Sequence, residues 1–269
     1  MSKTAVITGA SGGVGKVYAQ RLASQGFDLI LTGRRKDKLE NLTNDLTQKG
    51  NIKITFVIAD LSNDQDLEHF IKVIQADGNI EMLVNSAGFG PDPKPFMELD
   101  EAVNEQMIKL HQIALLRLIK AVVPEMEKHG KGTIINVASI VGFVPALGWS
   151  LYCATKAFQI SFSETLFLEL KPKGIQVQVL CPGTMNTDFA RDFTEEHRKA
   201  LLAMVKGNLQ QEAVVDYSLK SLKNKNKVIC EPPGRQTRLH KLSVFVPRTL
   251  QYRVLASRRN SAKKASKAN

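Results

Sequence analysis

The sequence predicts a single α/β domain whose core is a doubly wound parallel sheet, and three observations lead to that prediction. Short β-branched runs alternate with amphipathic stretches along the chain, an order typical of parallel strands joined by crossover helices. The strand candidates are almost continuously apolar, as strands covered on both faces are. The length of 269 residues is enough for one substantial core, and the pattern requires no second one.

Six strand candidates carry this prediction, and helical patterns fill the gaps between them. They occupy residues 4–8, 29–32, 54–59, 82–85, 133–138 and 177–180. Pro182 and Gly183 close the sixth strand. Beyond it we expect helices over 187–204 and 210–222, a short strand over 228–230, a break at Pro232-Pro233-Gly234 and further helix to about residue 256.

The domain organisation follows from these elements. Residues 1–230 are expected to form the sheet domain, and 231–256 a helical C-terminal extension. The last segment, 257–269, is of low complexity and basic, so we expect it to be disordered. No apolar run is long enough to cross a bilayer and the chain passes from Met1 straight into a strand-like run, which favours a cytoplasmic enzyme.

The net charge of +11 is unevenly distributed. Residues 206–269 hold 15 Lys and Arg against 3 acids, a net of +12, which leaves −1 for residues 1–205. Such a tail could contact anionic lipid, nucleic acid or an acidic carrier protein. A solvated helix followed by a frayed end explains the same charge equally well.

Cysteine and histidine usage gives no sign of a metal site. Cys153, Cys181 and Cys230 are far apart and odd in number, so reduced structural thiols are expected. The histidines other than His111 have no cysteine or carboxylate partner at ligand spacing. We therefore predict no metal.

A glycine-rich turn follows the first strand candidate directly and opens a helix at Lys16. Glycines at such a corner allow a tight turn and let the backbone approach a pyrophosphate, which the helix N-terminal amides then hold. The sequence therefore predicts a dinucleotide site. Its candidate contacts are Gly9, Ser11, Gly13, Val14 and Gly15.

The residues after the next three strands refine the nucleotide prediction. Arg34 and Arg35 stand where an NAD-preferring protein usually has an acid for the ribose hydroxyl. Arginine pairs with a 2′-phosphate instead, so NADP(H) is favoured, although two exposed arginines at a helix start are the alternative. Asp60, with Leu61 beside it, is a candidate for the adenine amino group. The wall on the nicotinamide side is assigned to Asn85, Ala87 and Gly88.

The catalytic candidates are Ser139, Tyr152 and Lys156. Tyr152 and Lys156 are four residues apart, so on a helix they lie on one face. A fixed positive charge nearby favours the phenolate and lowers the tyrosine pKa. This pairing predicts a tyrosine that serves as an acid or base.

With these motifs in place, the chain resembles the short-chain dehydrogenase/reductase family over roughly residues 3–230. The family's TGxxxGxG motif is matched at Thr8, Gly9, Gly13 and Gly15, its NNAG motif at 85–88 with Ser86 as a departure, and its PGxxxT motif at 182–187. Ser139, Tyr152 and Lys156 stand at the family spacing.

The resemblance implies a Rossmann fold and hydride transfer between NADP(H) and a carbonyl carbon. Tyr152 would then protonate the carbonyl oxygen, Ser139 would hydrogen-bond it, and Lys156 would hold the nicotinamide ribose and lower the tyrosine pKa. Thr187 and the backbone around Thr184 would bracket the carboxamide, and Pro182 and Gly183 are further cofactor contacts.

One relay position departs from the family pattern. Many members carry an asparagine where this chain has His111. A histidine can donate, accept and exchange protons near neutral pH, so His111 is a candidate substitute in a proton relay. A histidine hydrogen-bonded between helices is the alternative.

The resemblance also implies a lid over about 184–226. Apolar lid residues Phe189, Phe193, Leu201, Leu202 and Met204, with Phe143, Leu147 and Trp149 at the substrate mouth, suggest a lipophilic or acyl substrate, although core packing explains them too. Family members commonly form homodimers or homotetramers through the helices spanning 103–128 and 152–170. The competing function is a non-catalytic dinucleotide sensor whose basic tail contacts nucleic acid or membrane.

Overall fold

The computed structural model describes residues 3–185, 187–205, 209–243, 245–253 and 256–257. Within them a seven-stranded parallel sheet has the order β3-β2-β1-β4-β5-β6-β7. The strands are β1 (Lys3–Thr8), β2 (Phe27–Gly33), β3 (Ile54–Ile58), β4 (Ile80–Asn85), β5 (Gly132–Val137), β6 (Ile175–Leu180) and β7 (Ile229–Cys230). The strand order reverses between β1 and β4, which confirms the predicted doubly wound sheet.

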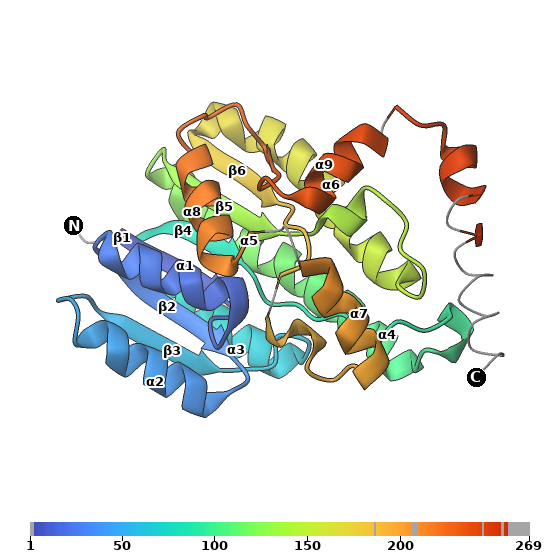
Figure 1. Cartoon of the computed structure of the whole chain (residues 1–269). Helices are drawn as coiled ribbons and strands as arrows, with labels where there is room; N and C mark the ends of the chain where they lie inside the picture. The colour runs from blue at the N-terminus through green and yellow to red at the C-terminus, as the bar shows by residue number, and fades with distance from the viewer. Residues whose placement is uncertain (1–2, 186, 206–208, 244, 254–255, 258–269) are drawn as a thin grey trace.

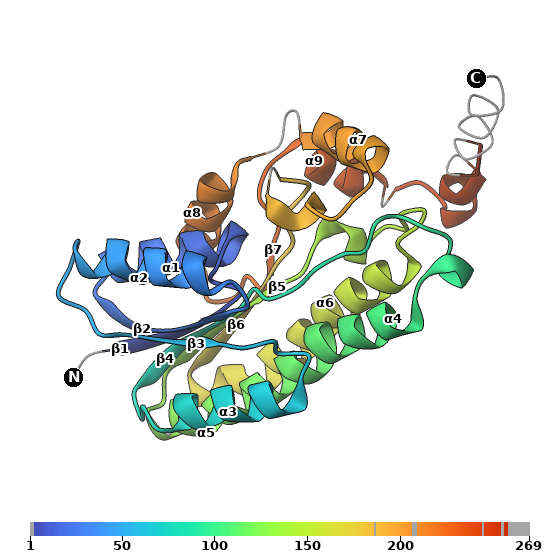
Figure 2. The ribbon, with the colours of Figure 1, turned by 90° about the horizontal axis from the view of Figure 1, so that it is seen from below.

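Helices cover both faces of the sheet, as Figure 2 shows. One layer holds α1 (Gly13–Ser24), α2 (Lys36–Thr47) and α8 (Gln211–Ser221). The other layer holds α3 (Asp64–Gln75), α4 (Glu101–Ile108), α5 (Leu115–Lys128) and α6 (Ser150–Leu170). To the right of the sheet in Figure 1 lie α7 (Glu195–Val205) and α9 (Arg235–Ser243).

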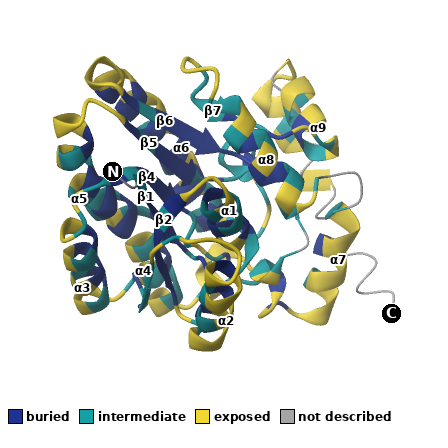
Figure 3. Cartoon of the chain, turned by 90° about the vertical axis from the view of Figure 1, so that its left-hand side faces the viewer, coloured by how far each residue is buried: buried dark blue, intermediate teal, exposed yellow. Residues whose placement is uncertain are grey.

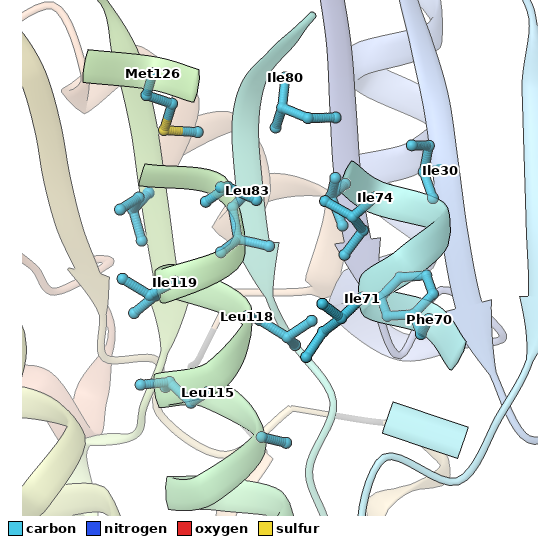
Figure 4. Packing of buried hydrophobic residues seen from close by; sticks show 14 of the residues in the cluster. Ile30, Phe70, Ile71, Ile74, Ile80, Leu83, Leu115, Leu118, Ile119 and Met126 are labelled. Atoms are coloured by element: carbon cyan, nitrogen blue, oxygen red, sulfur yellow. The ribbon is translucent and has the colours of Figure 1, made fainter. Parts of the chain in front are cut away.

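The core is divided by the sheet into two apolar layers. Figure 4 shows the layer beneath α3 and α5, where Leu118 of α5 points toward Ile71 of α3 and Ile119 projects from the other side of α5. Burying a side chain of this size stabilises the fold by about 1.5–3 kcal/mol. Figure 3 shows the consequence, with buried strands at the centre and exposed outer helix faces.

Two predicted helices differ in the structure. The stretch predicted as one helix over 103–128 contains a π-helical turn, Lys109–Ala114, between α4 and α5. The helix predicted over 187–204 begins only at Glu195. Thr187 instead accepts a hydrogen bond from the Phe189 amide at 3.2 Å and caps the short 3-10 turn Asp188–Ala190, because a threonine hydroxyl competes with helix formation at such a position.

The C-terminal extension is partly described. α9 ends at Ser243, and residues 248–253 form a further helical turn after Pro247. The disorder predicted for 257–269 falls almost entirely outside the described residues. Of the helices that the structure describes, none combines the length and the apolar character that a bilayer span requires.

Candidate active site

The glycine-rich turn joins β1 to α1 as predicted and is held in a tight conformation. Gly9 has φ +68°, and a Cβ atom there would stand 3.0 Å from the Ala87 backbone. A Cβ on Gly15 would come within 2.5 Å of the Gly9 carbonyl oxygen, so neither site accepts a side chain without movement. The N-cap of α1 is Gly12, which has no side chain to cap the first turn. The amides at this end of α1 therefore suit a phosphate ligand.

Thr8 ties this turn to the segment that follows β4. Its Oγ1 accepts hydrogen bonds from the Ser86 and Ala87 amides, each at 2.9 Å. Asn85 donates from Nδ2 to Asn136 of β5 at 2.9 Å, so the ends of three strands are linked. The predicted contacts of residues 85–88 and of the glycine-rich turn thus come together at one edge of the sheet.

Arg35 is fixed beside the glycine-rich turn. Its guanidinium donates to the Ser11 carbonyl oxygen at 2.8 Å and also pairs with Asp188. Lys38 donates to the same Asp188 carboxylate at 3.0 Å. The Arg35 and Lys38 hydrogen bonds lower the pKa of Asp188 to about 2. Two cations that could hold a phosphate therefore converge on one carboxylate of the segment after β6.

Arg34 is more exposed than Arg35 and has a different partner. Its Nη1 is 3.5 Å from Oδ2 of Asp60. Partial burial works against ionisation of Asp60, but hydrogen bonds from the Ser62 hydroxyl and amide, with the Arg34 charge, outweigh it and lower the pKa of Asp60. Asp60 is thus an ionised acceptor next to buried Leu61.

Ser139 and Tyr152 form the hydroxyl pair of the candidate site. Ser139 caps the 3-10 turn Ile140–Gly142 after β5, and Tyr152 lies in the first turn of α6. Burial raises the pKa of Tyr152 well above its ordinary value, while a hydrogen bond with Ser139 acts in the opposite direction. Tyr152 is therefore a protonated phenol at neutral pH, and burial by itself makes it a weaker acid than a free tyrosine.

Lys156 lies one turn further along α6, with its ammonium 5.6 Å from the centroid of the Tyr152 ring. Its Nζ donates to the Val137 carbonyl oxygen and to Oε1 of Gln159, both at 3.0 Å. Burial lowers the pKa of Lys156 to about 7. The expected lowering of the tyrosine pKa does not appear, because desolvation of both side chains outweighs their mutual attraction.

His111 lies in the π-helical turn with both ring nitrogens engaged. Nε2 accepts from the Phe89 amide at 3.1 Å, so the proton belongs on Nδ1, which is 3.0 Å from Oγ1 of Thr155. Burial, followed by the Lys156 charge, holds the pKa of His111 well below its ordinary value. The ring is neutral and joins the π-helical turn to α6.

Aromatic rings pack around the Tyr152 ring and form an aromatic cover beside it. Trp149 lies 5.7 Å and Phe189 5.6 Å from the Tyr152 ring, centroid to centroid. Phe193 completes the cluster at 5.7 Å from Phe189. Phe143 does not belong to it, because its ring stacks on His240 of α9 at 4.6 Å. Of the other apolar candidates, Leu201 packs with this cluster, while Leu147, Leu202 and Met204 are exposed.

The segment after β6 is anchored on both sides of the site. Asp92 accepts from the Thr194 amide at 3.2 Å and lies 2.9 Å from Nδ1 of His197. At the start of the segment, the Pro182 carbonyl accepts from the Ile140 amide at 3.1 Å, which places Pro182 and Gly183 beside Ser139. The predicted cofactor and catalytic residues therefore surround one region.

Four participants were not predicted from the sequence. They are Lys38, Asp92, Gln159 and Asp188. Lys38 follows the arginine pair by three residues and Asp188 follows Thr187, so proximity to motifs was a usable signal for these two. Gln159 follows Lys156 by three residues on α6, which was a signal of the same kind. Asp92 gave none, because Thr194 and His197 are more than 100 residues away in the chain.

Comparisons with known proteins identify the family of the chain. The model of the short chain dehydrogenase family matches residues 3–198. The very-long-chain 3-oxoacyl-CoA reductase of Mus musculus is 34% identical over 194 residues, which make up 71% of this chain. The chain spans only about 62% of the length of that relative.

Two solved structures, each 30% identical in sequence, cover 97% of the chain. The short-chain dehydrogenase from Sphingobium yanoikuyae in complex with NADPH has a TM-score of 0.78 and is covered over 95% of its length. The bulky-bulky ketone specific alcohol dehydrogenase from Comamonas testosteroni has a TM-score of 0.75 and is covered over 94%. With its sheet order, its glycine-rich turn and these relatives, the chain belongs to the short-chain dehydrogenase/reductase family of oxidoreductases.

Proposed function

We propose that the protein is an NADP(H)-dependent oxidoreductase that interconverts a carbonyl and a secondary alcohol. The observation that carries the proposal is the convergence of Ser139, Tyr152 and Lys156 beside the glycine-rich turn, beneath an aromatic cover. Such a set can hold a carbonyl oxygen, protonate it and keep water away from it.

The residues present fit a phosphate-bearing dinucleotide. The closely packed Gly9 and Gly15 leave backbone next to the α1 N-terminus, and Arg35 and Lys38 lie together where a 2′-phosphate needs cations. When bound, the nicotinamide donates or accepts the hydride. Asp60 is the proposed acceptor for the adenine amino group.

The proton chemistry belongs to the chain itself. Tyr152 is protonated at neutral pH and donates its proton to the substrate oxygen during reduction. Ser139 donates a hydrogen bond to the same oxygen and so orients it. Lys156 supplies a buried positive charge next to the phenol, which favours the phenolate left after the transfer.

The aromatic cover supports a lipophilic or acyl substrate. Trp149 and Phe189 place aromatic rings rather than charges beside Tyr152, and Phe193 packs against Phe189. The relatives point the same way, since one is named for a very-long-chain 3-oxoacyl-CoA and another for bulky-bulky ketones. We therefore expect ketones with large apolar substituents to be turned over faster than small ones.

The test is NADPH consumption over a panel of ketones and aldehydes. Tyr152→Phe removes the proton donor and is expected to lower kcat by about 10²–10⁴-fold while NADPH still binds. Tyr217→Phe is the matched control, because its hydroxyl contacts Lys227 outside the site. Unchanged turnover in Tyr152→Phe would refute the acid role. NADPH binding without turnover of any carbonyl would favour the sensor alternative.

We further propose that the C-terminal extension contacts an anionic lipid surface. Residues 232–269 contain ten Lys and Arg and no acid. Leu239, Leu242 and Phe245 are 56%, 65% and 86% exposed. Exposed apolar side chains among basic ones are typical of interfacial segments.

Vesicle co-sedimentation tests the lipid contact. Leu242→Ser with Phe245→Ser is expected to weaken binding to phosphatidylserine vesicles, whereas Met97→Ser, at an exposed apolar residue elsewhere, is not. Equal binding of all variants, or equal binding to neutral vesicles, would contradict this contact.

A homo-oligomer through α5 and α6 also remains our proposal. Ile113, beside α5, and Leu168 of α6 are exposed apolar residues on these elements. Light scattering on the full chain and on Leu168→Arg tests it, since a charge in a subunit interface should lower the mass. A monomeric parent protein would contradict the proposal.

A further inference from the structure

Gln159 links the catalytic lysine to the π-helical turn. Its side chain is 2% exposed and is engaged at both ends. Oε1 accepts from Nζ of Lys156 at 3.0 Å, and Nε2 donates to the His111 carbonyl oxygen at 3.0 Å. One buried amide therefore connects the ammonium of α6 to the backbone of the neighbouring element.

The π-helical turn explains why this carbonyl is within reach. In a π-helical turn the backbone ladder is wider than in an α-helix, and such turns are frequent at functional sites. Lys109–Ala114 adopts this form between α4 and α5, and the His111 carbonyl accepts from a side chain of α6. The His111 ring, fixed by Phe89 and Thr155, holds the turn in place.

We propose that Gln159 is a positioning residue for the reduction, which holds the Lys156 ammonium in place and favours its charged form. The inference rests on the proposed function, because it assigns Lys156 a role in turnover. It does not make Gln159 a catalytic residue, since its contacts are with Lys156 and His111.

The surroundings of Lys156 show why a neutral amide matters here. The titratable groups that face it are Tyr152 on its own helix, His111 on the π-helical turn and Cys181 after β6. Burial raises the pKa of Cys181 and lowers that of His111, so both are neutral. Among the described residues, the ammonium donates to two neutral oxygens, those of Val137 and Gln159. Removing one of them weakens the charged form.

The experiment compares the pH dependence of kcat in three variants. Gln159→Leu removes the side-chain acceptor of the Lys156 ammonium, so the alkaline fall of kcat should move to lower pH. A shift of about one pH unit would make kcat about tenfold lower at pH values above the pKa of Lys156. Gln159→Glu puts a carboxylate beside the ammonium and should move the same limb to higher pH. Gln178→Leu is the control, because this buried glutamine bonds Ser218 and Ser221 instead.

The outcomes separate the inference from the function on which it rests. Opposite shifts in the Leu and Glu variants, with the control at the parental pH, support the positioning role. If the pH profiles of Gln159→Leu and Gln159→Glu coincide with those of the parent and the control, the positioning role is overturned, even if kcat falls. Loss of packing alone lowers kcat without moving the pH at which it falls. Gln159→Met, which keeps the length of the side chain, repeats the test if Gln159→Leu does not fold. Absence of turnover in the parent overturns the proposed function itself.

Discussion

Removal of Arg35 is expected to change nucleotide preference more than nucleotide binding as such. Its guanidinium is held by the Ser11 carbonyl and lies beside Lys38, so it is already oriented at the corner of β2 and α2. A hydrogen bond to a charged group contributes about 1.5–3 kcal/mol. At 1.36 kcal/mol per factor of ten, Arg35→Ala should weaken NADPH about 10- to 150-fold and NADH by less than about threefold.

The measurement is the dissociation constant of each nucleotide by calorimetry. Arg35→Lys should recover only part of the affinity, because an ammonium lacks the bidentate fork of a guanidinium. Asp188→Asn should act in the opposite direction, since the carboxylate now paired with Arg35 and Lys38 competes with the 2′-phosphate. Arg117→Ala, whose partners lie on α3, is the control. Equal weakening of NADPH and NADH by Arg35→Ala would refute the assignment.

Three further results are expected. His111→Ala leaves the Phe89 amide without its acceptor and opens a cavity, so the free energy of unfolding measured in urea should fall by about 2–4 kcal/mol. A fall of less than about 1 kcal/mol would contradict the structural role of His111. Trp149→Ala should raise KM for bulky ketones, whereas Leu147→Ala, at an exposed site, should not; equal effects would count against the aromatic cover. The pKa of Asp188 is lowered to about 2, so its ion pairs stabilise the fold above about pH 4 and are lost as the pH falls toward 2. Because the side chain is half exposed, this contribution should be only about 1 kcal/mol. If the Tm of Asp188→Asn fell over this pH range as steeply as the parental Tm, the assignment would be wrong.

Much of the fold was accessible from the sequence because strand periodicity and motif position are local properties. Each of the six strand candidates overlaps a strand of the sheet, and the glycine-rich turn lies between β1 and α1. The prediction was wrong where side chains override local propensity. Thr187 caps a 3-10 turn instead of entering a helix, and the π-helical turn interrupts the stretch predicted as one helix.

The protonation state of the candidate catalytic groups required the tertiary structure. Spacing placed Tyr152 and Lys156 on one helix face and indicated a lowered tyrosine pKa. Burial instead raises the pKa of Tyr152 and lowers that of Lys156, because desolvation depends on what surrounds both groups in three dimensions. The same holds for His111, which the sequence left open between a relay and a structural role, and whose ring nitrogens are both engaged here.

The sequence by itself determined the fold class, the glycine-rich turn and the order of Ser139, Tyr152 and Lys156, since these depend on residue type and spacing along the chain. Only the tertiary structure decided which charges meet. It pairs Arg35 with Asp188, and it brings the Gln159 amide of α6 to the His111 carbonyl. The first of these contacts spans about 150 residues and the second depends on the neighbouring π-helical turn. Contacts of this kind arise from packing of elements against one another, which a linear pattern does not encode.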